Sequence, residues 1–308
     1  MLSLKARLFC FMLKHRNILR FKRKKDPIDW NTYDAVLGFR QDVEKGARFA
    51  KKLPPDIKIL PVTIGELPAE WILTSQTKKN KVILYFHGGG YVSGTCNSHR
   101  MHVAKFVKGS KVGALLFEYR LAPEHTFPAA LEDALAAYHW LLSQDISPSS
   151  VVFVGDSAGG GLCLATLLAL RDQSIQLPTA AAVLSPVTDF TCTGESYKTN
   201  LKKCLAPEGS TLAFAKHYAG NNDLSLPYIS PLFGDLQGLP PLLIYAGGDE
   251  TLRDDSIRFA NKAEKAGVDV RLEIGKGLFH CYPVCAPLFP EATQAMSEIG
   301  QFIKKATE

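Results

Sequence analysis

The sequence of 308 residues predicts an α/β fold in which a mostly parallel sheet is covered by helices on both faces. Short apolar runs typical of strands alternate along the chain with segments whose apolar residues recur at helical spacing. These runs lack the apolar–polar alternation that a solvent-exposed sheet face imposes, which favours strands buried on both faces. Because consecutive βαβ units build parallel sheets, the order of the segments predicts one α/β core. The chain is longer than an average domain, so we expect an inserted or appended cap.

The first 25 residues differ in charge from the rest of the chain. They contain nine of the 36 Lys and Arg residues and none of the 30 Asp and Glu residues. The remainder is therefore mildly acidic, which argues against a nucleic-acid-binding body. Apolar residues recur between the basic ones at roughly helical spacing: Leu4, Leu8, Phe11, Met12, Ile18 and Leu19. The apolar run 8–13 is too short for a secretory signal, so we expect a helix that packs on the core or, less favoured, lies on an anionic membrane surface.

The segments that follow change from helical to strand periodicity. A second helical pattern covers residues 30–52 and ends before a pair of prolines. Residues 57–64 and 70–74 predict the two strands of a hairpin, and residues 81–86 form a continuous apolar strand.

Strands and helices then alternate to the end of the chain. We predict strands over residues 112–119, 151–154, 180–184, 242–245 and 270–274. Helices are predicted directly after residue 157 and over residues 128–142, 256–266 and 290–305. Residues 186–225 are irregular apart from a helical pattern near 211–218.

The strongest candidate for chemistry is Ser157, which lies between a predicted strand and a predicted helix. Gly155 and Gly159 flank it in the pattern G-x-S-x-G, where a side chain at either glycine would collide with the strand or helix. Such a turn exposes the serine hydroxyl and leaves the Ala158 N–H at a helix N-terminus, which favours developing negative charge. The alternative interpretation is a glycine-rich helix start with no catalytic role.

Three glycines follow the strand 81–86 and the residue His87. Glycines allow a close approach of the backbone to a ligand and leave N–H groups available, as an oxyanion hole requires. We therefore predict that the N–H groups of Gly88, Gly89 and Ala158 form this hole. The alternative is a flexible loop. His87, and Asp156 beside the serine, are expected to fix loop geometry.

A serine nucleophile also needs a base and a carboxylate that orients the base. Asp249 and Glu250 follow the predicted strand 242–245, and His280 is the only histidine after them. This order, serine then acid then histidine, is the order found in α/β-hydrolases. His280 is therefore the candidate base, and both carboxylates remain candidates for the acid.

The seven cysteines are odd in number and scattered, which favours reduced thiols in a cytosolic protein over a disulfide framework. Cys281 and Cys285 lie beside His280, but no second Cys/His pair has matching spacing. We therefore expect no metal site. The sequence contains no run of 18 apolar residues, so a membrane-spanning helix is not expected.

Several motifs resemble the hormone-sensitive-lipase family of esterases from about Trp71 to the C-terminus. They are HGGGYVSG, YRLAPEHTFPAALEDA, VGDSAGGGL, LSPVTDF and SPLFGDLQGLPPLLIYAGGDETLRDD, followed by the loop that carries His280. Many relatives have Asp two residues before the leucine of Asp-Pro-Leu-Arg-Asp. The equivalent residue here is Glu250, so the resemblance favours Glu250 over Asp249 as the acid.

The resemblance also implies an α/β-hydrolase core without a metal or cofactor. It assigns residues 1–50 to an N-terminal helical cap segment, 51–308 to the catalytic domain, and 186–225 to a second cap segment. The expected activity is that of a serine carboxylesterase on small esters with short to medium acyl chains. The expected location is the cytoplasm, with peripheral contact to a membrane as the alternative. The alternatives are an amidase, lactonase or deacetylase that uses the same triad, and a non-catalytic receptor. The sequence leaves the oligomeric state open.

Overall fold

The computed structural model describes residues 2–14, 28–48, 53–204, 206 and 209–308. Its centre is an eight-stranded sheet in the order β1-β2-β4-β3-β5-β6-β7-β8. The strands are β1 (Lys58–Ile64), β2 (Leu67–Leu73), β3 (Lys78–Phe86), β4 (Val112–Phe117), β5 (Val151–Asp156), β6 (Ala180–Leu184), β7 (Leu242–Gly247) and β8 (Val270–Gly275). β2 pairs antiparallel with β1 and β4, and all other neighbours are parallel. The predicted mostly parallel sheet is therefore confirmed.

The middle of the sheet is buried on both faces, as the unbroken apolar runs predicted. Every residue of β4, β5, β6 and β7 is buried. β5 lies between β3 and β6, with Val82 paired to Val151 and Val152 paired to Ala180. The carboxyl end of β5, where Ser157 follows, is therefore in the middle of the carboxyl edge of the sheet.

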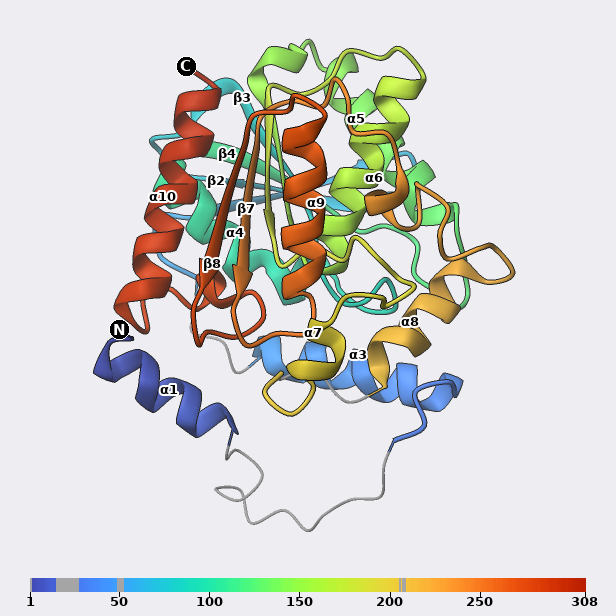
Figure 1. Cartoon of the computed structure of the whole chain (residues 1–308). Helices are drawn as coiled ribbons and strands as arrows, with labels where there is room; N and C mark the ends of the chain where they lie inside the picture. The colour runs from blue at the N-terminus through green and yellow to red at the C-terminus, as the bar shows by residue number, and fades with distance from the viewer. Residues whose placement is uncertain (1, 15–27, 49–52, 205, 207–208) are drawn as a thin grey trace.

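Helices cover both faces (Figure 1). One apolar core lies between the sheet and α5 (Ala129–Ser143), α6 (Ala158–Asp172) and α9 (Arg253–Lys265). A second core lies on the other face, under α4 (Cys96–Ser110) and α10 (Pro290–Ala306). α4 and α10 approach each other closely at Gly109 and Gly300. A Cβ on Gly300 would lie only 2.8 Å from the carbonyl carbon of Gly109.

The remaining helices gather at one end of the molecule (Figure 1). They are α1 (Leu4–Lys14), α3 (Tyr33–Arg48), α7 (Ser196–Thr199) and α8 (Ser210–Ala219). Short 3-10 turns occur at Pro148–Ser150, Pro231–Phe233 and Tyr282–Cys285. The predicted helical patterns over 1–25 and 30–52 correspond to α1 and α3, while the apolar positions Ile18 and Leu19 lie outside the described residues.

Candidate active site

Ser157 occupies a sharp turn between β5 and α6. β5 ends at Asp156, α6 begins at Ala158, and Ser157 has φ 55° and ψ −121°. A non-glycine residue with positive φ is strained and persists only where its surroundings hold it. Here the Ser157 N–H donates to Leu184 O over 2.8 Å, and Ser157 O accepts from the Val187 N–H over 3.1 Å. The predicted strand–turn–helix geometry is therefore present and is held by the chain beyond β6.

The flanking glycines are required by close backbone contacts. A Cβ on Gly155 would lie 2.5 Å from Gly159 O, and one on Gly159 would lie 2.1 Å from Phe86 O. The second contact joins the turn to the end of β3, from which the glycine loop emerges. The serine turn and the glycine loop are therefore packed against each other without intervening side chains.

Glu250 and His280 form a direct pair. Glu250 is fully buried, and its Oε2 contacts Nδ1 of His280. Its Oε1 accepts from the Ser185 hydroxyl over 2.7 Å and from the Gly247 N–H over 2.5 Å. Burial of a carboxylate is costly unless hydrogen bonds replace its hydration, and these three contacts provide that replacement. A carboxylate on Nδ1 selects the tautomer whose Nε2 is unprotonated and able to accept a proton.

The pKa of His280 is set by opposing effects. Burial lowers it, but the neighbouring Cys281 and Glu250 outweigh burial and raise the pKa above its usual range. A raised pKa means that the imidazolium form is stabilised. This is the form that results when His280 takes up a proton.

Asp249, the other candidate acid, lies away from His280. Its carboxylate is 3.5 Å from Lys14 Nζ, and its N–H donates to Leu278 O. Of the two adjacent acidic residues, the structure therefore brings Glu250 and not Asp249 to the histidine.

The glycine loop requires one correction to the predicted oxyanion hole. The Gly88 N–H donates to Asp156 Oδ1 over 3.0 Å, so this donor is already used. Gly89 and Gly90 line the cavity that Ser157 also lines. Between the described residues we find no hydrogen bond from the N–H of either glycine. The candidate donors are therefore Gly89, Gly90 and Ala158, and the prediction of Gly88 is wrong because Asp156 accepts its N–H.

Asp156 and His87 hold this loop. Asp156 Oδ1 also accepts from the Tyr85 hydroxyl over 2.8 Å. The His87 ring stacks on Tyr119 with 4.1 Å between ring centroids, and Nδ1 lies 2.9 Å from Gly88 O. Burial lowers the pKa of His87 to about 3, so the ring is neutral and Nδ1 donates. These contacts agree with the expected role of both residues in loop geometry.

Ser157 and His280 line one cavity of about 390 Å³. Its walls are mainly apolar and include Phe39 and Val43 of α3 and Phe214 of α8. The described residues show no hydrogen bond between the Ser157 hydroxyl and His280. Such contacts are often long in substrate-free enzymes and shorten in the complex. The cavity thus joins the candidate nucleophile, base and oxyanion donors.

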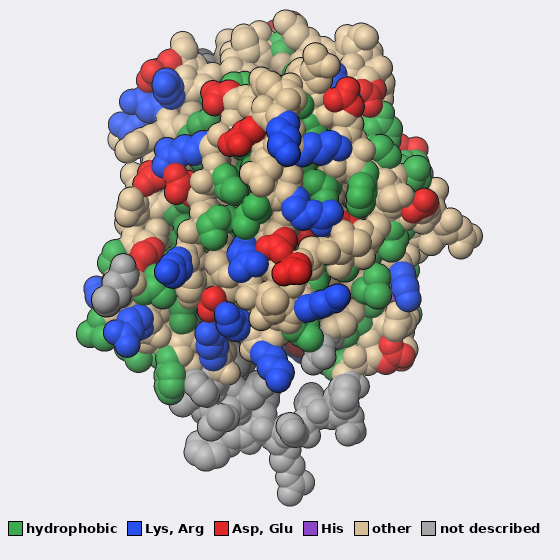
Figure 2. All heavy atoms as spheres, in the orientation of Figure 1, with side chains coloured by type: hydrophobic (Ala, Val, Ile, Leu, Met, Phe, Trp, Pro, Cys, Tyr) green, Lys and Arg blue, Asp and Glu red, His purple; other side chains and the backbone are tan. Residues whose placement is uncertain are grey.

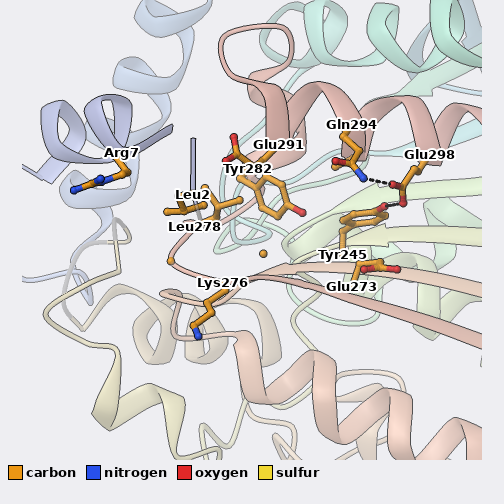
Figure 3. A pocket seen from close by; sticks show the side chains of 13 residues that line it. Leu2, Arg7, Tyr245, Glu273, Lys276, Leu278, Tyr282, Glu291, Gln294 and Glu298 are labelled. Atoms are coloured by element: carbon orange, nitrogen blue, oxygen red, sulfur yellow. Dashed lines mark hydrogen bonds between the residues drawn. The ribbon is translucent and has the colours of Figure 1, made fainter. Parts of the chain in front are cut away.

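A larger cavity of about 740 Å³ lies elsewhere, between α1, β8 and α10 (Figure 3). Three of its polar side chains bond to each other: Glu298 accepts from Tyr245 over 2.6 Å and from Gln294 over 2.9 Å. None of the predicted site residues lines it. The candidate chemistry is therefore confined to the smaller cavity.

Sequence reasoning missed Ser185, which follows β6 directly. Its hydroxyl donates to Glu250 and accepts from the Cys281 N–H over 2.9 Å. The available signal was a serine at the carboxyl end of a buried strand next to the candidate loops. Cys281, considered above for a metal, places its thiol 3.6 Å from Leu184 O. The described residues contain no group of three potential metal ligands.

Comparison with known proteins identifies the class and then the family. A family model described as alpha/beta hydrolase fold matches residues 83–284. An acetyl-hydrolase of Streptomyces hygroscopicus is 40% identical over 247 residues, which are 80% of this chain and 82% of the relative. A crystal structure of EstE5, soaked with p-nitrophenyl butyrate, is 40% identical with a TM-score of 0.90 over 99% of each chain. An esterase structure from the bacterial hormone-sensitive lipase family is 37% identical, with a TM-score of 0.89 over 99% of each chain.

The chain therefore belongs to the hormone-sensitive-lipase family of α/β-hydrolase esterases. It is a serine ester hydrolase. Within the described ranges, no helix has the length and apolar character needed to cross a membrane.

Proposed function

We propose that the protein is a carboxylesterase that cleaves small esters with short to medium acyl chains through an acyl-enzyme. Ser157 is the nucleophile, His280 the general base and acid, and Glu250 the orienting carboxylate. The observation that carries the proposal is the buried Glu250–His280 contact at the cavity that Ser157 lines.

In the first half of the reaction, the Ser157 oxygen attacks the ester carbonyl while His280 Nε2 takes the hydroxyl proton. The negative charge moves to the carbonyl oxygen, where the N–H groups of Gly89, Gly90 and Ala158 stabilise it. The tetrahedral intermediate collapses, His280 gives its proton to the leaving alcohol, and the acyl group remains on Ser157. Water then attacks this ester with His280 as base, which releases the carboxylic acid and restores the serine.

The size of the acyl group is inferred from the cavity and the relatives. A mainly apolar space of about 390 Å³ suits a short or medium chain. The name of the Streptomyces relative, acetyl-hydrolase, and the use of p-nitrophenyl butyrate with EstE5 concern those proteins and support the same range.

We further propose that the cap consists of α3 within residues 1–50 and of residues 186–225, over a catalytic domain of residues 51–308. Phe39 and Phe214 support this division because they bring both segments to the cavity. No described residue of α1 lines the cavity. We therefore leave α1 out of the part of the N-terminal segment that contacts substrate.

A panel of p-nitrophenyl esters from acetate to palmitate tests both activity and chain length. The expected result is the highest kcat/KM among the shorter chains and a loss of about 10⁶ in kcat for Ser157→Ala, as in a serine protease. Ser149→Ala, at an exposed serine, is the matched control and should remain fully active. Substantial activity in a folded Ser157→Ala variant, or faster cleavage of amides or lactones than of open-chain esters, would contradict the proposal.

A further inference from the structure

One face of α1 is docked on the body of the protein. Phe9 packs against Phe279 and Phe289, with ring centroids 5.8 and 5.5 Å apart. Ser3 donates through its hydroxyl to Glu291 over 2.8 Å. Leu13 lies on the same side of the helix, partly buried against the same core. These contacts fix which side of α1 faces the protein.

The opposite face of α1 is apolar and exposed. Leu4, Leu8 and Met12 are 80%, 57% and 43% exposed. Their spacing of four residues places them along one side of the helix, away from the side of Phe9 and Leu13. Single exposed leucines are common, but a row of them on one helix indicates an interaction surface. We call these three residues the outer row of α1.

Positive charge flanks the outer row. At 100° per residue, Lys5 lies on one flank and Arg7 and Lys14 on the other, and all three are exposed. α1 has no acidic residue. Figure 2 shows hydrophobic and basic side chains intermingled at the lower left, where Figure 1 places α1. An apolar row between basic flanks is the pattern of a helix that lies in the surface of an anionic membrane.

α1 is also close to the candidate active site on its protein side. Phe279 precedes His280, and Asp249, the partner of Lys14, precedes Glu250. Figure 1 shows α1 at the same end of the molecule as α3 and α8, which line the active-site cavity. A partner bound to the outer row would therefore lie beside the end of the protein that contains the active-site cavity.

We propose that the outer row of α1 docks on a lipid bilayer that contains anionic lipid. The charges favour this occupant over a second copy of the chain. Pairing two outer rows face to face would bring the Lys5, Arg7 and Lys14 side chains of both copies together, and like charges oppose such a contact. Anionic headgroups instead neutralise these side chains while the outer row enters the acyl boundary. The proposal does not depend on the triad assignment.

Vesicle co-sedimentation of the full chain tests the proposal. The probes are vesicles of phosphatidylcholine with and without phosphatidylglycerol, at low and high salt. Expected are binding to the anionic vesicles, weaker binding at high salt because salt screens exposed charges, and little binding to neutral vesicles. The double variant Leu4→Gln/Leu8→Gln should lose about tenfold or more in partition coefficient. Lys5→Gln/Arg7→Gln should weaken binding and reduce its dependence on salt.

The matched control is Leu60→Gln/Leu226→Gln, which replaces two exposed leucines outside α1 and should bind like the wild type. All variants should hydrolyse a soluble ester at the wild-type rate, which verifies folding separately from binding. Wild-type binding by the Leu4/Leu8 variant, or equal binding to neutral and anionic vesicles, would overturn the proposal. So would a dimer in sedimentation velocity that the Leu4/Leu8 variant dissociates, because the row would then join two copies.

Discussion

Exchange of Glu250 for glutamine tests the assignment of the orienting acid most directly. In Glu250→Gln, the amide oxygen can still accept from Ser185 and Gly247, so the loop keeps two of the three contacts of the carboxylate. The amide nitrogen then faces His280 Nδ1 and donates to it. This favours the tautomer with the proton on Nε2, which cannot accept the proton of Ser157.

The expected loss is large for Glu250 and small for its neighbour. The corresponding Asp→Asn change in a serine protease costs about 10⁴ in kcat, equal to about 5.4 kcal/mol of activation free energy. Asp249→Asn removes a carboxylate that is 3.5 Å from Lys14, whose side chain is 44% exposed. An exposed ion pair of this kind contributes only about 0–1 kcal/mol to stability, and Asp249 makes no contact with His280, so kcat should change less than about fivefold.

Stopped-flow or continuous measurement of p-nitrophenyl butyrate hydrolysis gives kcat for both variants, with circular dichroism to verify the fold. The predicted ranking requires Glu250→Gln to be at least about a hundredfold slower than Asp249→Asn. Equal rates would show that His280 does not rely on Glu250. The reverse ranking would transfer the orienting role to Asp249 and refute the argument from the buried contact.

Three further changes follow from the same contacts. In the wild type, kcat/KM should rise with pH, because His280 must be neutral to accept a proton. The midpoint of this rise should lie above the usual histidine pKa of about 6.5, because the pKa of His280 is raised. A midpoint below that value would contradict the assignment. Ser185→Ala leaves the buried Cys281 N–H without its partner and removes one donor from Glu250, so kcat should fall about tenfold or more, measured with the same ester. Gly159→Ala places a Cβ 2.1 Å from Phe86 O and should destabilise the protein by about 1–3 kcal/mol in urea unfolding. Gly46→Ala, where a Cβ meets nothing within 4 Å, is its control and should be neutral or stabilising.

Local patterns were sufficient to predict the fold and to select Ser157 and His280 as candidates, whereas the choice of Glu250 over Asp249 depended on the family resemblance. Unbroken apolar runs predicted buried parallel strands, and glycines two residues from Ser157 predicted the turn, because each signal depends on neighbours in the sequence. The predicted strand 112–119 ends earlier, at Phe117. The side chains of its last two residues bond outside the sheet: Glu118 accepts from the Cys96 N–H, and the Tyr119 hydroxyl donates to His87 O.

The one error in the site came from a contact between distant segments. The pattern of three glycines predicts free N–H groups, but Asp156, 68 residues away, accepts the N–H of Gly88. The helical spacing in residues 1–25 singled out Leu4, Leu8 and Met12, but these side chains are exposed, and the other side of α1, with Phe9 and Leu13, meets the core. That depended on Phe279 and Phe289, far along the chain.

Ser185 has a consequence for protein engineering. One hydroxyl joins the loop after β7 to the loop after β8, although neither loop contains it. A graft of these two loops onto a related scaffold would therefore carry over the acid and the histidine without the group that sets their relative position. The transferable unit is four side chains from four strand ends, with the serine after β6 moved together with Ser157, Glu250 and His280.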